Sequence, residues 1–278
     1  MNLANGLTRA TGAAMKGNGM QILDSIQGVL FDIDGVLYVG KEVIPGAIET
    51  VALLRQRGLP LRFITNTTTE SHQGLHSRLT ALGFNVSAGE ILSAVSAAIV
   101  ALRRMKNPRC LFVVDDRVRG DFAEFTADEK FPDVVVVGDI GNRWSYDLLN
   151  ELFGLVRKGA HLIALHKNRF WQTEKGLQMD IGAFVTGIEY ATGKRATIMG
   201  KPSPAFFNIA LHELGLPPHH VAIVGDDIDS DIGGGQDAGM RGILVQTGKY
   251  REDYARESAI KPDLLLPSVA ELPRVLGF

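Results

Sequence analysis

Cysteine is almost absent from this chain of 278 residues, which contains only Cys110. A single cysteine cannot form an intrachain disulfide, so the fold does not depend on an oxidising compartment. The paired cysteines of a zinc site are missing as well. Cys110 lies in the apolar run 110–114, which indicates a buried structural thiol and not a nucleophile.

An excess of charge of either sign is also lacking, because 29 Lys and Arg stand against 31 Asp and Glu, a net charge of −2. We find no local basic stripe, so we expect neither a nucleic-acid partner nor attraction to an anionic membrane. No apolar run approaches the ~18 residues of a membrane span. Residues 1–20 are small, polar and glycine-rich, without the apolar stretch of a secretory signal. We expect a cytoplasmic protein in which residues 1–20 are a disordered extension or precede a true start at Met20.

Apolar residues make up 45% of the chain and charged residues 22%, proportions typical of a globular protein with a sizeable core. Short apolar runs alternate with longer segments whose apolar residues recur at helical spacing. The runs are continuous, as expected for strands that are buried on both faces of a parallel sheet. They occupy residues 28–31, 61–64, 111–114, 134–137, 162–165 and 221–224. This alternation predicts an α/β fold built on a doubly wound parallel sheet.

The length of the chain favours about two domains. Unusual polar residues follow three of the predicted strands, and ligands of open α/β sheets bind beyond the carboxyl ends of strands. A long stretch with its own α/β pattern separates the second of these strand ends from the third. We therefore predict a core formed by residues 21–86 and 195–278, with residues 87–194 inserted as a second domain.

Asp32 and Asp34 directly follow the first predicted strand, and Gly35 would allow a sharp turn after them. A carboxylate at a strand end can attack phosphorus as a nucleophile. The second carboxylate, two residues on, returns to the same side of the chain and could protonate a leaving group and then activate water. Taken alone, the motif is equally compatible with an Asp-rich turn, since Asp-Gly is a common turn dipeptide.

Two further motifs carry groups that could hold a phosphate. Thr65 and Asn66 end the second strand, where hydroxyl, amide and backbone N–H groups could bind phosphate oxygens, although both residues also favour helix starts. Lys201 lies between Gly200 and Pro202, in a loop that its prolines restrain. Its compact charge suits a phosphate or a cluster of carboxylates, whereas a lone lysine is usually solvated.

Four aspartates lie within residues 226–231, directly after a predicted buried strand. Their mutual repulsion would be relieved by a cation, and Mg²⁺ needs few protein carboxylates. An EF-hand loop is excluded because Ile232 stands where glycine is required and Ala238 where glutamate is required. A nucleotide fingerprint at residues 233–238 is rejected because it follows a loop and not a strand.

Together these parts resemble the four motifs of the haloacid dehalogenase superfamily, in order and in context. The motifs are residues 32–37, 65–66, 200–202 and 225–231. The insertion between the second and third motifs resembles the type-IIA cap of that superfamily, and residues 184–193 and 239–250 narrow the likeness to one branch of capped phosphatases.

The resemblance implies an Mg²⁺-dependent phosphatase that acts on a phosphate monoester, a phosphoramidate or a pyrophosphate through an aspartyl-phosphate. It implies that Asp32 is the nucleophile and a Mg²⁺ ligand. Asp34 would be the general acid and base, with its backbone carbonyl on the metal, and Asp226 would be the third protein ligand.

For the substrate, the resemblance implies that Thr65, Asn66 and Lys201 bind the phosphoryl group. Asp231 and Asp227 would hold in place the residues that touch the metal and the substrate, without touching either themselves. The expected partner is a small phosphorylated substrate, and a homodimer through the inserted domain is left open.

The loop 166–171 follows a predicted strand of the insertion and mixes cationic and aromatic residues, as a substrate loop does. His166, Asn168 and Arg169 are its candidate substrate contacts, although a solvated loop with a structural tryptophan fits equally well. Two other functions compete with the phosphatase: a non-catalytic module that binds a phosphorylated ligand, and a dehalogenase. Asp34 distinguishes them, since neither alternative needs an acid at that position.

Overall fold

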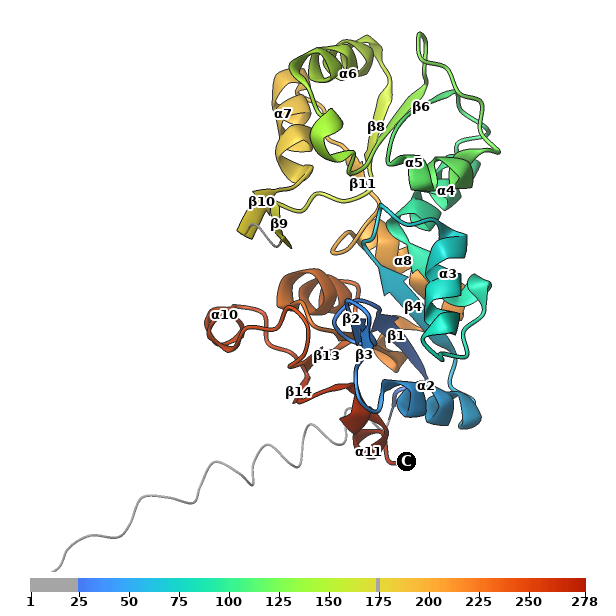
Figure 1. The fold of residues 1–278 in the computed structure, drawn as a ribbon, viewed down its shortest axis with the longest axis vertical. Helices are drawn as coiled ribbons and strands as arrows, with labels where there is room; N and C mark the ends of the chain where they lie inside the picture. The colour runs from blue at the N-terminus through green and yellow to red at the C-terminus, as the bar shows by residue number, and fades with distance from the viewer. Residues whose placement is uncertain (1–24, 174–175) are drawn as a thin grey trace, which may run out of the picture.

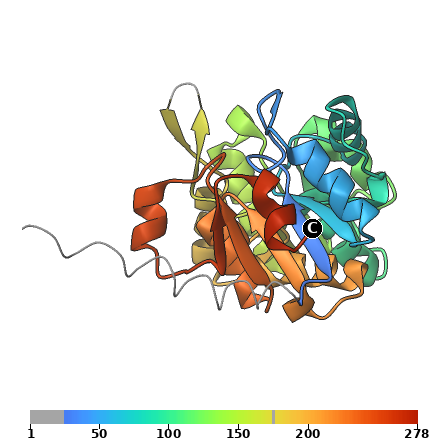
Figure 2. The ribbon, with the colours of Figure 1, turned by 90° about the horizontal axis from the view of Figure 1, so that it is seen from below.

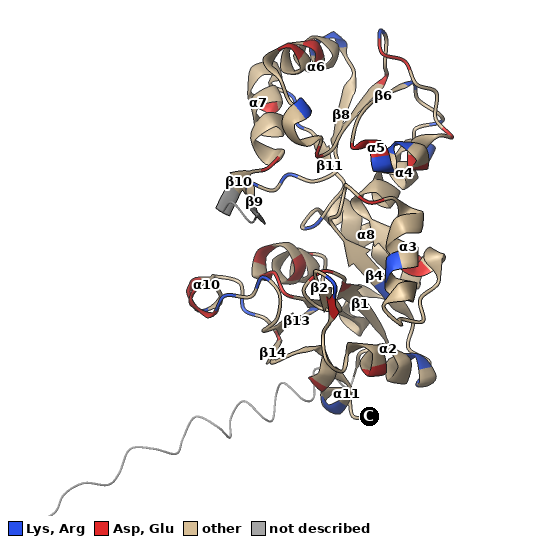
Figure 3. Cartoon of the chain, viewed as in Figure 1, with Lys and Arg blue, Asp and Glu red and all other residues tan. Residues whose placement is uncertain are grey.

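The computed structural model describes residues 25–173 and 176–278, so the extension expected at residues 1–20 lies outside the described residues. The described chain forms two parallel sheets, stacked along the long axis of the molecule (Figure 1). No helix in these two ranges is long and apolar enough to cross a membrane. Residues of both charge signs are interspersed over the two parts (Figure 3).

The first sheet has six parallel strands in the order β14-β13-β12-β1-β4-β5. Its strands are β1 Gly28–Asp32, β4 Leu61–Thr65, β5 Ile91–Ser93, β12 Val221–Gly225, β13 Arg241–Val245 and β14 Leu264–Leu266. Every residue of β1 and β12 is buried, as their continuous apolar runs predict.

Both faces of this sheet are covered, because successive residues of one strand pack into different apolar clusters. Leu30 of β1 belongs to one cluster, whereas its neighbours Val29 and Phe31 belong to the other. The ring of Phe31 stacks on that of Phe63 in β4, with centroids 5.9 Å apart. Figure 2 shows helices on either side of the sheet, so the predicted doubly wound α/β fold is confirmed.

The helices that cover the first sheet come from both ends of the chain. They are α2 Ala47–Gln56, α3 His72–Ala81, α4 Ala94–Arg104, α8 Pro204–Leu214, α9 Gly234–Asp237, α10 Glu252–Glu257 and α11 Leu272–Val275. A short hairpin, β2 Tyr38–Val39 with β3 Glu42–Val43, follows β1 directly. Gly35, at φ 91°, allows the chain to turn between β1 and this hairpin.

The second sheet has four parallel strands in the order β11-β8-β7-β6. They are β6 Cys110–Val113, β7 Val134–Val137, β8 His161–Ala164 and β11 Thr197–Ile198. Helices α5 Asp116–Arg119, α6 Tyr146–Lys158 and α7 Gly182–Thr192 and the hairpin β9 Phe170–Thr173 with β10 Gly176–Met179 complete this part. Cys110 is buried in it, as predicted.

The strand pairing extends each sheet past the boundaries that the sequence suggests. Residues 91–93 pair with β4 in the first sheet, although the boundary was expected after residue 86. Residues 197–198 pair with β8 in the second sheet, beyond the boundary expected at residue 194. Both strands are too short for an apolar run to reveal them. We therefore use "inserted segment" for residues 94–198.

The two parts share one apolar cluster. It runs from Leu30 and Ile64 of the first sheet through Ala98 of α4 to Phe112 and Val136 of the second sheet. Since burial of this apolar surface stabilises both sheets together, the inserted segment is packed on the core and not merely tethered to it.

Candidate active site

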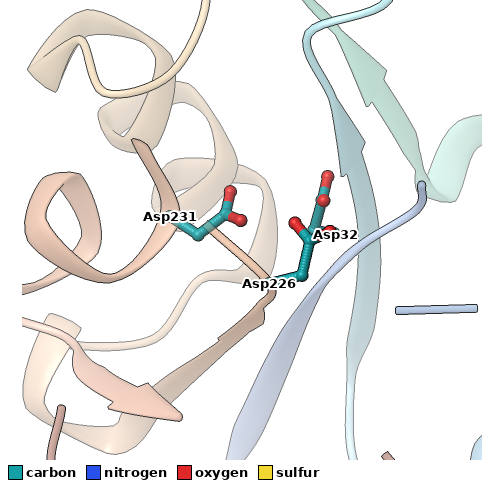
Figure 4. A group of neighbouring side chains, drawn as sticks. All are labelled: Asp32, Asp226 and Asp231. Carbon is teal, nitrogen blue, oxygen red and sulfur yellow. The ribbon is translucent and has the colours of Figure 1, made fainter. Parts of the chain in front are cut away.

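The order of the first sheet brings three of the sequence motifs to one edge. β1 lies between β12 and β4, so Asp32, Thr65 and Asp226 all follow or end adjacent parallel strands. One carboxylate oxygen each from Asp32, Asp226 and Asp231 lies within 4.8 Å of the others, and all three residues are buried. Figure 4 shows the three side chains directed toward one another.

Lys201 provides the positive charge inside this group. Its ammonium lies 2.5 Å from Oδ1 of Asp32 and 2.7 Å from Oδ1 of Asp231, and the residue is only 3% exposed. Burial lowers the pKa of Lys201, but the charges of Asp231 and Asp32 outweigh it and raise the pKa above its ordinary value. The lysine is therefore charged, and it is held by two carboxylates at once.

Asp226 has no such partner. Its Oδ2 accepts a hydrogen bond of 2.6 Å from the backbone N–H of Lys249, but its buried Oδ1 has no hydrogen-bond partner among the described residues. Burial, together with the charges of Asp32 and Asp231, raises the pKa of Asp226 to about 8. Burial also raises the pKa of Asp231 to about 6, although Lys201 opposes it. The charge of Lys249 opposes this rise in the pKa of Asp226 but does not cancel it.

Two glycines make room for the Asp226 carboxylate. A Cβ atom on Gly35 would lie 1.9 Å from Oδ2 of Asp226, and one on Gly248 would lie 2.0 Å from the same oxygen. Both glycines have positive φ, 91° and 61°, which side chains disfavour independently. The loops after β1 and β13 therefore enclose this carboxylate with backbone alone.

Asp34 stands apart from the three carboxylates. It is half-buried, and its Oδ2 accepts a long hydrogen bond of 3.4 Å from Oγ1 of Thr67. Thr67 in turn interacts with Thr65 through its hydroxyl at 3.1 Å and its backbone N–H at 3.0 Å. Thr65 and Asp34 are thus linked through Thr67, a residue that the sequence reasoning did not single out.

The side-chain amide of Asn66 is bonded to the backbone of Lys201. Its Oδ1 accepts from the backbone N–H of Lys201 at 2.7 Å, and its Nδ2 donates to the backbone carbonyl of Lys201 at 2.9 Å. The amide therefore positions Lys201, and its second N–H takes no part in these two bonds. The backbone N–H of Asn66 also takes no part in these two bonds, and we still expect it to bind a phosphoryl oxygen.

Asp227 supports the site through its backbone and not through its carboxylate. Its N–H donates to Oδ2 of Asp231 at 3.1 Å. Its Oδ1 accepts from the N–H groups of Asp229 and Ser230, each at 3.0 Å, and so begins the helical turn Ile228–Gly233. Residues 227–230 thus fix the direction from which Asp231 reaches Lys201.

The loop after β8 lies close to the core. His166 is 5% exposed, and its Nδ1 has no hydrogen-bond partner in the described part of the chain. Burial lowers its pKa although Asp180, 3.9 Å from its Nε2, opposes that effect, so the ring is neutral near pH 7. The carbonyl of the preceding Leu165 would lie 2.7 Å from a Cβ atom on Gly200, next to Lys201. Asn168 and Arg169 use their backbone carbonyls to accept from Gly182 and Asp180, which ties the loop to the start of α7.

Lys249 is a charged group beside the site that the sequence reasoning missed. Burial lowers its pKa, but the charges of Asp32 and Asp226 outweigh that effect and raise it. The nearby Thr247 hydroxyl donates to the carbonyl of Gly35 at 2.5 Å. Residues 246–249 follow β13, so the same search for polar residues after buried strands would have found them.

Comparison with known proteins gives two family models that match this chain. A model described as haloacid dehalogenase-like hydrolase matches residues 29–127, and one described as HAD-hydrolase-like matches residues 198–272. The first range contains Asp32, Asp34, Thr65 and Asn66 of the site. The second contains Lys201, Asp226 and Asp231.

Relatives and solved structures with a similar sequence or fold include haloacid dehalogenase-like hydrolases and phosphatases. Human haloacid dehalogenase-like hydrolase domain-containing protein 2 is 43% identical over 227 residues, which cover 82% of this chain and 86% of that protein. Bovine phospholysine phosphohistidine inorganic pyrophosphate phosphatase is 38% identical over 255 residues, covering 90% and 93%. The structure of 4-nitrophenylphosphatase from Thermotoga maritima superposes with a TM-score of 0.82 at 27% identity, covering 91% and 98%. NagD from E. coli gives 0.79 at 30% identity, covering 88% and 98%.

The buried ion pairs of Lys201 lead to a prediction about stability. Lys201→Met should lower the free energy of unfolding by about 3–5 kcal/mol near pH 7, because it leaves Asp32 and Asp231 buried without a cation. The loss should be smaller at about pH 4.5, because Asp231, whose pKa is raised to about 6, is then protonated and needs no partner, and the raised pKa of Asp32 acts in the same direction. Urea denaturation at both pH values measures it. Lys41→Met, at an exposed position, is the control, and an equal loss at both pH values would contradict the prediction.

Proposed function

This chain belongs to the haloacid dehalogenase-like hydrolases and is a phosphatase, and we propose that it transfers the phosphoryl group of a small substrate to Asp32 before water releases it. The observation that carries this proposal is the setting of Asp32, which lies at the end of β1 beside Lys201 and two further buried carboxylates. Lys201 favours the ionised, nucleophilic form of Asp32 and opposes the burial that raises its pKa.

The substrate class follows from what the site can bind. Lys201 and the backbone N–H of Asn66 would hold the phosphoryl oxygens at the edge of the sheet, and the buried Thr65 hydroxyl, which donates to Thr67 in this structure, would join them on giving up that bond. Two relatives are named for phosphoryl compounds, one for phospholysine, phosphohistidine and inorganic pyrophosphate and one for 4-nitrophenyl phosphate. We take the substrate to be a phosphate monoester, a phosphoramidate or a pyrophosphate, with no nucleic acid involved.

The reaction divides into two displacements at phosphorus. In the first, a carboxylate oxygen of Asp32 forms a bond to phosphorus while the bond to the leaving group breaks, and Asp34 gives its proton to that leaving group. In the second, Asp34 takes a proton from water, the water oxygen bonds to phosphorus, and the bond to Asp32 breaks. Asp34 is suited to both steps because it lies two residues from Asp32, outside the paired carboxylates.

The carboxylates also fit a divalent cation, for which we propose Mg²⁺. The unpartnered Oδ1 of Asp226 and its raised pKa are the features that a bound cation would relieve. Asp32 and Asp226, with the backbone carbonyl of Asp34, would hold the ion, while Asp231 is already engaged by Lys201. When bound, Mg²⁺ would neutralise charge on the phosphoryl oxygens and on these carboxylates.

The inserted segment would complete the enzyme in two ways. His166, Asn168 and Arg169 would line the substrate side of the site, with the neutral His166 Nδ1 available for a hydrogen bond. Tyr146 and Tyr190, on the contacting helices α6 and α7, are 79% and 91% exposed and would support a homodimer through this segment. We place the enzyme in the cytoplasm.

The nucleophile can be tested by substitution. Asp32→Asn should abolish phosphate release from p-nitrophenyl phosphate, because an amide is a poor nucleophile, while the circular dichroism spectrum stays that of the wild type. The matched control is Asp229→Asn, since Asp229 belongs to the same acidic run but is exposed and bonded to Tyr254. Turnover near the wild-type rate in Asp32→Asn would exclude the covalent mechanism.

Asp34 can be tested through the leaving group. Asp34→Asn should slow phosphorylation of Asp32 most for alkyl phosphates, whose basic leaving groups need a proton, and least for p-nitrophenyl phosphate. Single-turnover rates on one substrate of each kind, in wild type and variant, measure the difference. Equal losses on both substrates would argue against acid catalysis, and no loss on either would remove Asp34 from the mechanism.

The cation can be tested through stability and pH. Without a divalent cation, stability should fall between about pH 5 and pH 8, because Asp226 and Asp231, with pKa values of about 8 and 6, keep protons that the unfolded chain has lost. MgCl₂ should restore it, so the gain in melting temperature over EDTA should be larger near pH 8 than near pH 5.5. NaCl at equal ionic strength and the variant Asp226→Asn are the controls. An equal gain at both pH values would contradict the assignment of Asp226.

A further inference from the structure

A polar pocket of about 490 Å³ lies beside the site, between the loop after β4, helix α3 and helix α5 of the inserted segment. Its wall carries three hydroxyl groups, one carboxylate and two guanidinium groups, supplied by Thr67, Thr69, Ser71, Glu70, Arg78 and Arg117. Apart from Thr67, none of these residues takes part in the chemistry described above.

Thr67 connects this pocket to the reacting groups. It lines the pocket, and its hydroxyl donates to Oδ2 of Asp34. Under the proposed function, Asp34 protonates the atom that leaves phosphorus, so the leaving group departs on the side that Asp34 faces. The pocket therefore lies where the leaving group of the substrate would extend.

The two guanidinium groups are held in place before any ligand binds. Arg78 pairs with Glu70 at 2.9 Å and is hydrogen-bonded to the hydroxyl of the buried Tyr38. Arg117 binds Asp115 through Nε at 2.9 Å and Nη2 at 3.0 Å, and within residues 25–173 and 176–278 its Nη1 has no hydrogen bond.

The inserted segment is also fixed against this part of the core. The carboxylate of Asp121, which follows α5, accepts from the backbone N–H of His72 at the start of α3 at 2.9 Å. Val118 and Phe122 are buried in the cluster shared by the two sheets. Arg117 thus faces α3 as a positioned wall of the pocket, although its side chain is 67% exposed and open to a ligand.

The wall offers more hydrogen-bond donors than acceptors. Its charged members are Arg78 and Arg117 against the single lining carboxylate of Glu70, while Asp115, which binds Arg117, lies outside the wall; the hydroxyls of Thr69 and Ser71 can donate as well. Guanidinium groups bind anionic oxygens in preference to neutral hydroxyls. We propose that this pocket receives an anionic oxygen group, a carboxylate or a second phosphate, carried by the leaving group of the substrate, with Arg117 as the specificity-determining residue. This inference rests on the proposed phosphatase function and narrows its substrate class.

A matched pair of substrates tests it. 3-Phosphoglycerate and glycerol 3-phosphate both carry phosphate on a primary carbon beside a secondary hydroxyl, and they differ in a carboxylate against a hydroxymethyl group. We expect the wild type to favour 3-phosphoglycerate by about tenfold in kcat/KM. Arg117→Ala should remove most of that preference by raising KM for 3-phosphoglycerate, and Arg117→Lys should restore part of it. Arg119→Ala, on the same helix but outside the pocket wall, should leave the preference unchanged.

A binding measurement separates this inference from the proposed function. Calorimetric titration of the Asp32→Asn variant with each compound requires no turnover, and we expect about tenfold tighter binding of 3-phosphoglycerate, lost when Arg117→Ala is added. If the wild type hydrolyses p-nitrophenyl phosphate but neither assay distinguishes the two compounds, the inference is wrong and the proposed function stands. If no phosphate ester is hydrolysed, the proposed function is wrong. If the two compounds also bind equally tightly, the inference that the pocket receives an anionic group is wrong as well.

Discussion

The ion pairs of Lys201 with Asp32 and Asp231 are the interaction on which the rest of the site depends. Three carboxylates buried at one sheet edge would repel each other strongly in the low-dielectric interior, and one ammonium at 2.5 and 2.7 Å offsets that repulsion for two of them. Other groups serve this arrangement: Asn66 holds the backbone of Lys201 from both sides, and Asp227 directs Asp231. The third carboxylate, Asp226, keeps an oxygen without a hydrogen-bond partner among the described residues, and the proposed cation site rests on that feature.

A second constraint is the packing of the inserted segment on the core. One apolar cluster joins the two sheets through α4, and the Asp121 contact with the start of α3 adds a polar link. Because these contacts are made by residues before β6 and around α5, they fix the part of the insertion that lines the polar pocket. The loop after β8 approaches the site from another direction, where the Leu165 carbonyl abuts Gly200. The substrate would therefore be enclosed by two separate segments of the insertion.

The site also divides its polar groups between two tasks. The side chains of Asp34, Thr65 and Thr67 are bonded to one another, whereas the Asn66 amide and the Asp227 carboxylate are bonded to backbone groups. Buried amides and carboxylates must find partners, so residues with phosphate-binding chemistry often serve the backbone instead. Residue type and position along the chain therefore do not reveal that the Asn66 amide bonds to the backbone of Lys201.

The sequence by itself determined the fold class and the convergence of the site. The continuous apolar runs of β1, β4 and β12 predict strands that are buried on both faces of a parallel sheet. Parallel strands place their carboxyl ends at one edge of the sheet, and Asp32, Thr65 and Asp226 lie at those ends. Only the tertiary structure decided what happens around that edge. Strands as short as β5 and β11 form through pairing with neighbours that are distant in sequence, so they leave no local pattern. Contacts between remote segments likewise decide three further features, which no periodicity or motif spacing encodes. They are the hydrogen-bond partners of Asn66, the enclosure of Asp226 by Gly35 and Gly248, and the placement of Arg78 and Arg117 in the wall of one pocket.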